Sequence, residues 1–179
     1  MRRILGLITV FLVASPMAAY IPQSTDIDGT VTVMKWSTSS LPITWQMNPT
    51  IGSKISGSRE QATVFRESFQ EWANITTAAV SFTEGSAIDP SVKPGFDRIN
   101  LITTNVTPAD FNSTAVGLTA AFSFTSTGLD QFGRTVEFPG QILEADIMFN
   151  PSTSFSTNDT MSTEFVDLES VMTHEVGHL

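Results

Sequence analysis

The chain contains no cysteine, only two histidines, and nine Lys and Arg against 18 Asp and Glu. Without cysteine, the fold must rely on its core, and on bound ions where they occur, rather than on disulfides. The formal net charge of −9 disfavours nucleic acid and anionic membranes as partners. The apolar runs are too short to span a bilayer comfortably.

The N-terminus has the pattern of a secretory signal peptide. Arg2 and Arg3 precede the apolar run 4–13, and small residues follow at Ala18 and Ala19. The pattern predicts a signal peptide at 1–19 and a secreted, extracellular product without a membrane segment after cleavage. Residues 20–179 are then of the right size for one domain with a single core.

Hydrophobic periodicity and turn residues predict an α+β fold with the order strand, helix, four strands, helix. The first helix is expected at 59–74, with Ser58 as N-cap and Gln61 completing a capping box. The second is expected to follow Asp167 as N-cap and to continue to Leu179. Strands are expected at 79–83, 98–103, 116–124 and 142–149, after a first strand or hairpin at 31–36 and 42–47. Loops are expected at 85–95 and 151–162, and a Gly-rich turn region at 126–140.

Both histidines belong to one motif, His174-Glu175-Val176-Gly177-His178, which is H-E-x-x-H. On a helix, residues four apart project from one face, so His174 and His178 can meet a single Zn²⁺. Glu175 lies beside that face, where it can take a proton from water that the zinc has made acidic. The alternative is that both histidines are ordinary polar residues of an amphipathic helix, but the complete motif favours zinc.

The remainder of the motif helix has a core-facing stripe. Gly177 weakens a helix by up to ~1 kcal/mol, which indicates that another group packs closely against it. The stripe consists of Leu168, Val171, Met172, Val176 and Leu179.

Three segments together resemble the matrixin branch of the metzincin zinc endopeptidases. They are REQATVFRESFQEWANIT followed by AVSFTE, GLTAAF followed by EADIMFN, and DLESVMTHEVGHL. The resemblance implies a twisted mixed sheet with two packed helices, zinc ligands His174 and His178, and Glu175 as catalytic base. It also implies that a protein or peptide substrate pairs with the edge strand 116–121, so that Leu118, Thr119 and Ala120 are the predicted substrate-binding residues.

The chain departs from the family pattern in several places. It stops at Leu179, before the glycine and third histidine that the family places after the motif, so we interpret it as a catalytic domain lacking its C-terminal subdomain and inactive alone. Ala120 and Met148 stand where many members have histidines for a second zinc. Calcium is a further candidate cofactor, with ligands among Asp130, Glu137, Glu144 and Asp146.

Two other interpretations stay open. One is another zincin branch, such as the gluzincins, in which the third ligand is a more distant glutamate. The other is a secreted, non-catalytic binding domain that retains the zinc helix. The sequence indicates neither the substrate preference nor the oligomeric state.

Overall fold

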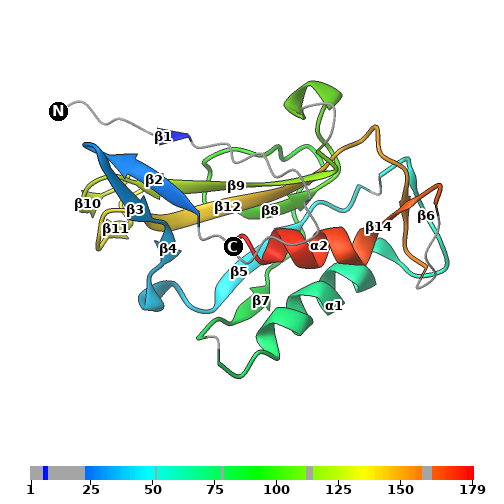
Figure 1. Ribbon diagram of the computed structural model, residues 1–179, viewed down its shortest axis with the longest axis horizontal. Coiled ribbons are helices and arrows are strands. Elements are labelled where there is room, and N and C mark those ends of the chain that lie inside the picture. The colour runs from blue at the N-terminus through cyan, green and yellow to red at the C-terminus, as the bar shows by residue number, and fades with distance from the viewer. Residues whose placement is uncertain (1–5, 8–22, 51, 78, 112–114, 159–162) are drawn as a thin grey trace.

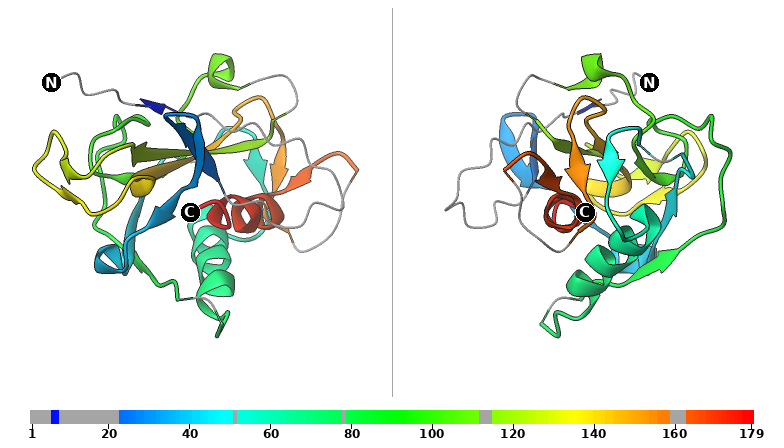
Figure 2. Two further views of the ribbon diagram at one scale, coloured as in Figure 1. Left: turned by 60° about the vertical axis from the view of Figure 1, so that its left-hand side comes forward. Right: turned by 90° about the vertical axis from the view of Figure 1, so that its right-hand side faces the viewer.

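A seven-stranded mixed sheet carries two helices on one of its faces (Figures 1 and 2). The computed structural model describes all residues except 1–5, 8–22, 51, 78, 112–114 and 159–162. The strands are β1 (Gly6–Leu7), β4 (Lys35–Trp36), β5 (Ile43–Met47), β7 (Phe82–Glu84), β8 (Asn100–Thr103), β9 (Gly117–Phe124) and β12 (Gln141–Phe149).

The order across the sheet is β1-β9-β12-β8-β5-β7, with β4 also paired to β12. Strand β12 runs parallel to β4 and β8, and β5 runs parallel to β8 and β7. Strand β9 is antiparallel to β12, and β1 is antiparallel to β9. This mixed sheet with two helices confirms the predicted α+β class.

Several short strand pairs lie outside the large sheet. Strands β2 (Ser24–Ile27) and β3 (Thr30–Val33) form a hairpin, as do β10 (Gly128–Leu129) and β11 (Thr135–Val136). A three-stranded sheet joins β6 (Ile55–Ser56), β13 (Phe155–Ser156) and β14 (Val166–Asp167). Short 3-10 helices occupy Thr38–Ser40 and Pro108–Asp110. The predicted turn region at 126–140 thus contains a short hairpin, and the predicted loop at 151–162 is corrected because it contains strand β13.

Helix α1 (Gln61–Ala73) follows the predicted apolar stripe but not the predicted cap. Val64 and Phe65 are fully buried. The N-cap residue is Glu60, without a side-chain cap bond, because the Ser58 hydroxyl donates to Asn158 and the Gln61 side chain accepts from Gly52 N–H. The capping-box prediction is wrong because both of its side chains bond to other segments.

Helix α2 (Leu168–Val176) begins as predicted, with the Asp167 carboxylate accepting from Ser170 N–H at 2.8 Å. It ends earlier than predicted, at Val176, with Gly177 as C-cap in a right-handed helical conformation. The last residues continue in a tighter turn, since the N–H groups of His178 and Leu179 bond to carbonyls three residues back. The predicted continuous helix to Leu179 is thus corrected at its last turn.

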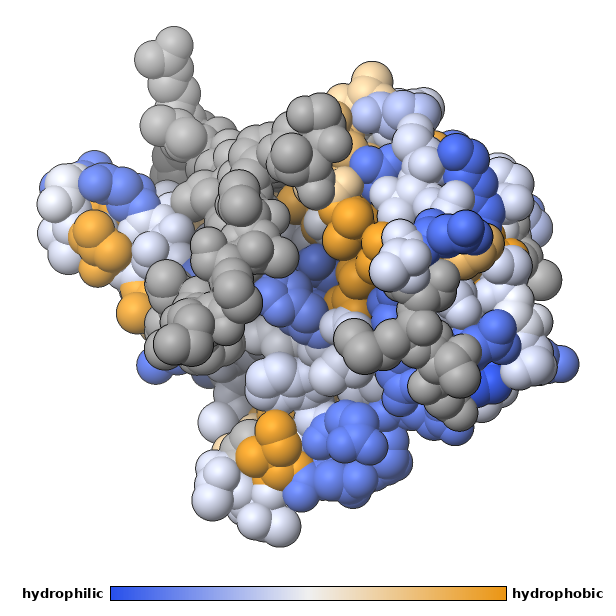
Figure 3. Space-filling view, turned by 45° about the vertical axis from the view of Figure 1, so that its right-hand side comes forward, coloured by the Kyte–Doolittle hydropathy of each residue, from blue (hydrophilic) through white to orange (hydrophobic). Residues whose placement is uncertain are grey.

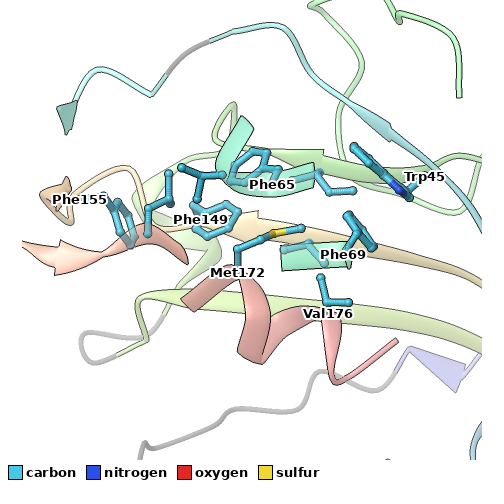
Figure 4. Packing of buried hydrophobic residues seen from close by; sticks show 11 residues of the cluster. Trp45, Phe65, Phe69, Phe149, Phe155, Met172 and Val176 are labelled. Atoms are coloured by element: carbon cyan, nitrogen blue, oxygen red, sulfur yellow. The ribbon is translucent and has the colours of Figure 1, made fainter. Parts of the chain in front are cut away.

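The main core lies between the sheet and both helices (Figure 4). The Phe65 and Phe149 rings stack with centroids 5.2 Å apart, and Trp45 stacks on Phe69 at 4.4 Å. Met172 of α2 is fully buried in the same cluster. Burial of one such side chain stabilises a fold by about 1.5–3 kcal/mol, so this core fixes α2 against α1 and the sheet.

The face drawn in Figure 3 is mostly polar where it is coloured, and apolar residues form small patches on it. No helix within the described residues is long and apolar enough to cross a membrane. The predicted signal peptide lies outside the described residues, apart from Gly6 and Leu7 in β1. Large hydrophobic side chains are exposed at Val31, Val33, Ile75, Leu129, Phe132 and Phe165.

Candidate metal and catalytic site

The C-terminal turn of α2 brings the two histidine side chains together. The Nε2 atoms of His174 and His178 are 3.1 Å apart, and the rings meet edge to face with centroids 4.8 Å apart. Two nitrogens at this separation can each lie at ~2.0–2.1 Å from one ion, with an angle of about 98° between them. That angle is close to tetrahedral, so the histidine pair fits two of the four ligand positions of a zinc ion.

The environment of His178 favours the neutral imidazole that binds metals. Burial, followed by repulsion from His174, lowers the pKa of His178 to about 4. Its Nδ1 atom is buried and has no hydrogen-bond partner among the described residues. At neutral pH the ring is therefore uncharged.

The histidine pair has no third protein ligand beside it in the part of the chain that the structure describes. There, no group of three or more His, Cys, Asp or Glu side chains is arranged to hold a metal ion. The described residues thus offer two candidate ligands, His174 and His178.

The Glu175 carboxylate points from α2 toward β9. Its Oε2 atom accepts a hydrogen bond from the Thr119 hydroxyl at 2.7 Å, and the same hydroxyl lies 3.1 Å from the Glu175 backbone carbonyl oxygen. Glu175 is only 5% exposed, and this burial raises the pKa of its carboxyl to about 7, against a lowering by the Thr119 bond. A carboxyl with this pKa can both take and return a proton near neutral pH.

Gly117 gives the Glu175 carboxylate room against the strand. A Cβ atom at Gly117 would lie 2.8 Å from Glu175 Oε1 and 2.9 Å from Val171 Cγ1. Any side chain here would push the carboxylate or the helix away from β9. Gly117 and Thr119 together form a seat for Glu175, which we call the β9 notch.

The predicted substrate-binding residues divide between the two faces of β9. Thr119 faces α2, as its bonds to Glu175 show. Leu118 and Ala120 lie on the other face, where they pack in an apolar cluster with Met148, Val106 and Phe111. The positions at which the matrixin resemblance implies second-zinc histidines, Ala120 and Met148, are thus both part of this cluster.

Two tryptophans hold the turn that carries His178. Trp72 Nε1 donates to the Thr173 carbonyl at 2.6 Å, and Trp36 Nε1 donates to the Leu179 carbonyl at 2.5 Å. A Cβ atom at Gly177 would lie 2.5 Å from Trp72 Cζ2. The indole of Trp72 is therefore the group whose close packing the glycine predicted. The sequence did not identify this partner, because Trp72 lies about 100 residues earlier.

The four predicted calcium-ligand candidates are engaged in other bonds. Glu144 accepts backbone N–H bonds from Asp97 and Arg98, and Asp146 accepts them from Gly95 and Leu101. Asp130 binds Arg134, and Glu137 accepts the hydroxyls of Ser37 and Ser39. Within the described residues they do not converge on one point as a cation site.

The buried pair Glu144 and Asp146 instead fixes the segment 95–101 to the middle of β12. We call this arrangement the carboxylate clamp. Burial raises the pKa of Glu144 to about 7 and that of Asp146 to about 8, against the lowering by their backbone N–H bonds.

Comparison with known proteins adds no identification. No family model matches the chain, and neither a curated protein nor a solved structure matches it.

Proposed function

We propose that this chain carries the catalytic helix and substrate-binding strand of a secreted, zinc-dependent endopeptidase of the metzincin type, similar to the matrixins. One observation carries the proposal. The Nε2 atoms of His174 and His178 lie 3.1 Å apart, and the buried Glu175 carboxylate lies on the same turn of α2, held by the adjacent strand. An amphipathic helix with two merely polar histidines would not need this convergence or the burial of the intervening glutamate.

The roles of the residues follow from this arrangement. His174 and His178 would hold the ion through their Nε2 atoms. A zinc ion bound there supplies Lewis acidity, which polarises a peptide carbonyl and makes water a nucleophile at neutral pH. Glu175 takes the proton of the attacking water and passes it to the leaving amine, which balances the hydrolysis.

Strand β9 supports the assignment of an extended peptide as substrate. It has β12 as its antiparallel partner on one side, while on its other side the only described strand that pairs with it is β1, at Phe122 and Ser123. Residues 118–120 therefore lie along an edge to which no described strand is paired. The β1 contact supports the view that this edge accepts an antiparallel strand, which is a known mode of peptide recognition.

The experiment measures zinc binding and proteolysis with the full-length gene product. We expect one zinc per molecule and cleavage of an unfolded protein, with both lost in His174→Ala and His178→Ala. Glu175→Gln is expected to retain zinc but to lose about 10²–10⁴-fold in kcat, because the base is gone.

Glu71→Gln is the matched control, since it neutralises an exposed carboxylate on α1 and should leave both properties unchanged. Stoichiometric zinc without any cleavage would favour the non-catalytic binding domain. Failure to bind zinc in the intact protein would reject both zinc-based readings.

A further inference from the structure

The β9 notch connects the candidate catalytic base directly to the strand proposed to bind substrate. The Thr119 hydroxyl donates to Glu175 Oε2 at 2.7 Å, and Gly117 leaves no space for a Cβ beside Oε1. The hydrogen bond from Thr119 and the absence of a side chain at Gly117 are independent features. Both accommodate the Glu175 carboxylate.

The side chain of Thr119 is not placed to contact a substrate. It is 3% exposed and faces α2, whereas an incoming strand would meet the backbone groups at the edge of β9. The sequence prediction placed Thr119 with Leu118 and Ala120 as substrate-binding residues. Pairing with a substrate would involve the strand backbone, whereas the Thr119 hydroxyl bonds to Glu175.

The strand that carries the β9 notch is paired with β12 along its whole length. Eight residue pairs hold β9 in antiparallel register with β12, from Gln141–Phe124 to Phe149–Gly117. Threonine is β-branched and stiff at χ1, so the strand backbone determines the position of its hydroxyl. The carboxylate of Glu175 is consequently fixed relative to the strand as well as to its own helix.

We propose that Thr119 is a positioning residue that ties the Glu175 carboxylate to the substrate-binding strand. A peptide paired with β9 would then present its carbonyl at a set distance from the base. This inference rests on the proposed endopeptidase function and adds a residue outside the H-E-x-x-H motif. Misplacement of a reacting group by about 1 Å can reduce a rate by roughly 10²-fold, which sets the scale of the effect.

The test compares Thr119→Val, which keeps the shape but removes the hydroxyl, with Thr119→Ser, which keeps the hydroxyl. In the full-length protein we expect Thr119→Val to lower kcat by about 10–100-fold with little change in KM or zinc affinity. Thr119→Ser should restore kcat to within a few-fold. Thr103→Val, which removes a buried hydroxyl on β8, is the matched control and should keep wild-type kcat.

A second measurement needs neither zinc nor activity. The side-chain carboxyl ¹³C signal of Glu175 in the zinc-free protein, assigned by its loss in Glu175→Gln, should shift in Thr119→Val at fixed pH. It should return in Thr119→Ser. Thr119→Ala removes the hydroxyl without added bulk and supplies the same comparison if the valine variant does not fold.

The outcomes separate the two proposals. An active wild type with unchanged kcat and an unchanged ¹³C signal in Thr119→Val would overturn the positioning role alone. Equal loss of kcat in the valine and serine variants would also overturn it, because the effect would then be one of packing. A wild type that binds zinc but cleaves nothing would overturn the endopeptidase proposal and this inference with it.

Discussion

Replacing Gly177 with alanine tests whether close packing, rather than backbone conformation, requires glycine in the turn between His174 and His178. Gly177 has φ −64° and ψ −14°, which any residue can adopt. The added Cβ would lie 2.5 Å from Trp72 Cζ2 and 3.1 Å from Cη2. The indole would have to move, and its bond to the Thr173 carbonyl would be weakened or lost.

The change in the free energy of unfolding follows from two destabilising contributions and one stabilising contribution. Overpacking costs about 1–3 kcal/mol, and the lost hydrogen bond about 0.5–1.5 kcal/mol. The higher helix propensity of alanine returns about 1 kcal/mol. We therefore expect Gly177→Ala to lower the free energy of unfolding by about 0.5–3.5 kcal/mol, and Tm by about 2–4 °C for each kcal/mol.

The assay is urea denaturation of the zinc-free protein in two backgrounds. In Trp72→Leu the obstructing ring is absent, so Gly177→Ala should become neutral or slightly stabilising. Gly95→Ala is the matched control, because a Cβ atom there meets nothing within 4 Å. Equal effects of Gly177→Ala in both backgrounds, or stabilisation of the wild type, would refute the packing argument.

Two further predictions concern the core and the carboxylate clamp. Phe65→Ala should lower the free energy of unfolding by about 3–5 kcal/mol, because Phe65 is fully buried between the sheet and α2. A loss below about 1 kcal/mol in urea denaturation would contradict this. Raised pKa values mean that Glu144 and Asp146 hold more protons in the folded than in the unfolded state at neutral pH. The free energy of unfolding of the zinc-free protein should therefore fall as pH rises through about 7 and 8. The Glu144→Gln, Asp146→Asn double variant should show a shallower fall. A rise in the free energy of unfolding of the wild type over this range would contradict the prediction.

The helix that carries the candidate site was predictable because its signals are local. Asp167 caps it, the apolar stripe has helical spacing, and the H-E-x-x-H motif is contiguous. The β2–β3 hairpin also has a local signal, because Asp28 and Gly29 lie between its two strands. Asp28 and Gly29 have φ of 51° and 82°, as the two central residues of an Asp-Gly hairpin turn require.

Other features depend on partners that are distant in the sequence. Strand β13 exists because Phe155 pairs with Ile55 and Val166, and a two-residue strand has no periodicity of its own. Ser58 was expected to cap α1, but Asn158 binds its hydroxyl from 100 residues away. Both faces of β9 are buried, so alternation could not show that Thr119 faces Glu175 while Leu118 faces Met148.

The carboxylate clamp has a practical consequence for a chain without cysteine. The segment 95–101, which a disulfide could have secured, is here held by four backbone N–H groups that donate to Glu144 and Asp146. Such bonds form and break with folding itself and are indifferent to thiol reagents. The same tertiary structure is accordingly accessible in reducing and in oxidising media, and refolding requires neither an oxidant nor a disulfide isomerase.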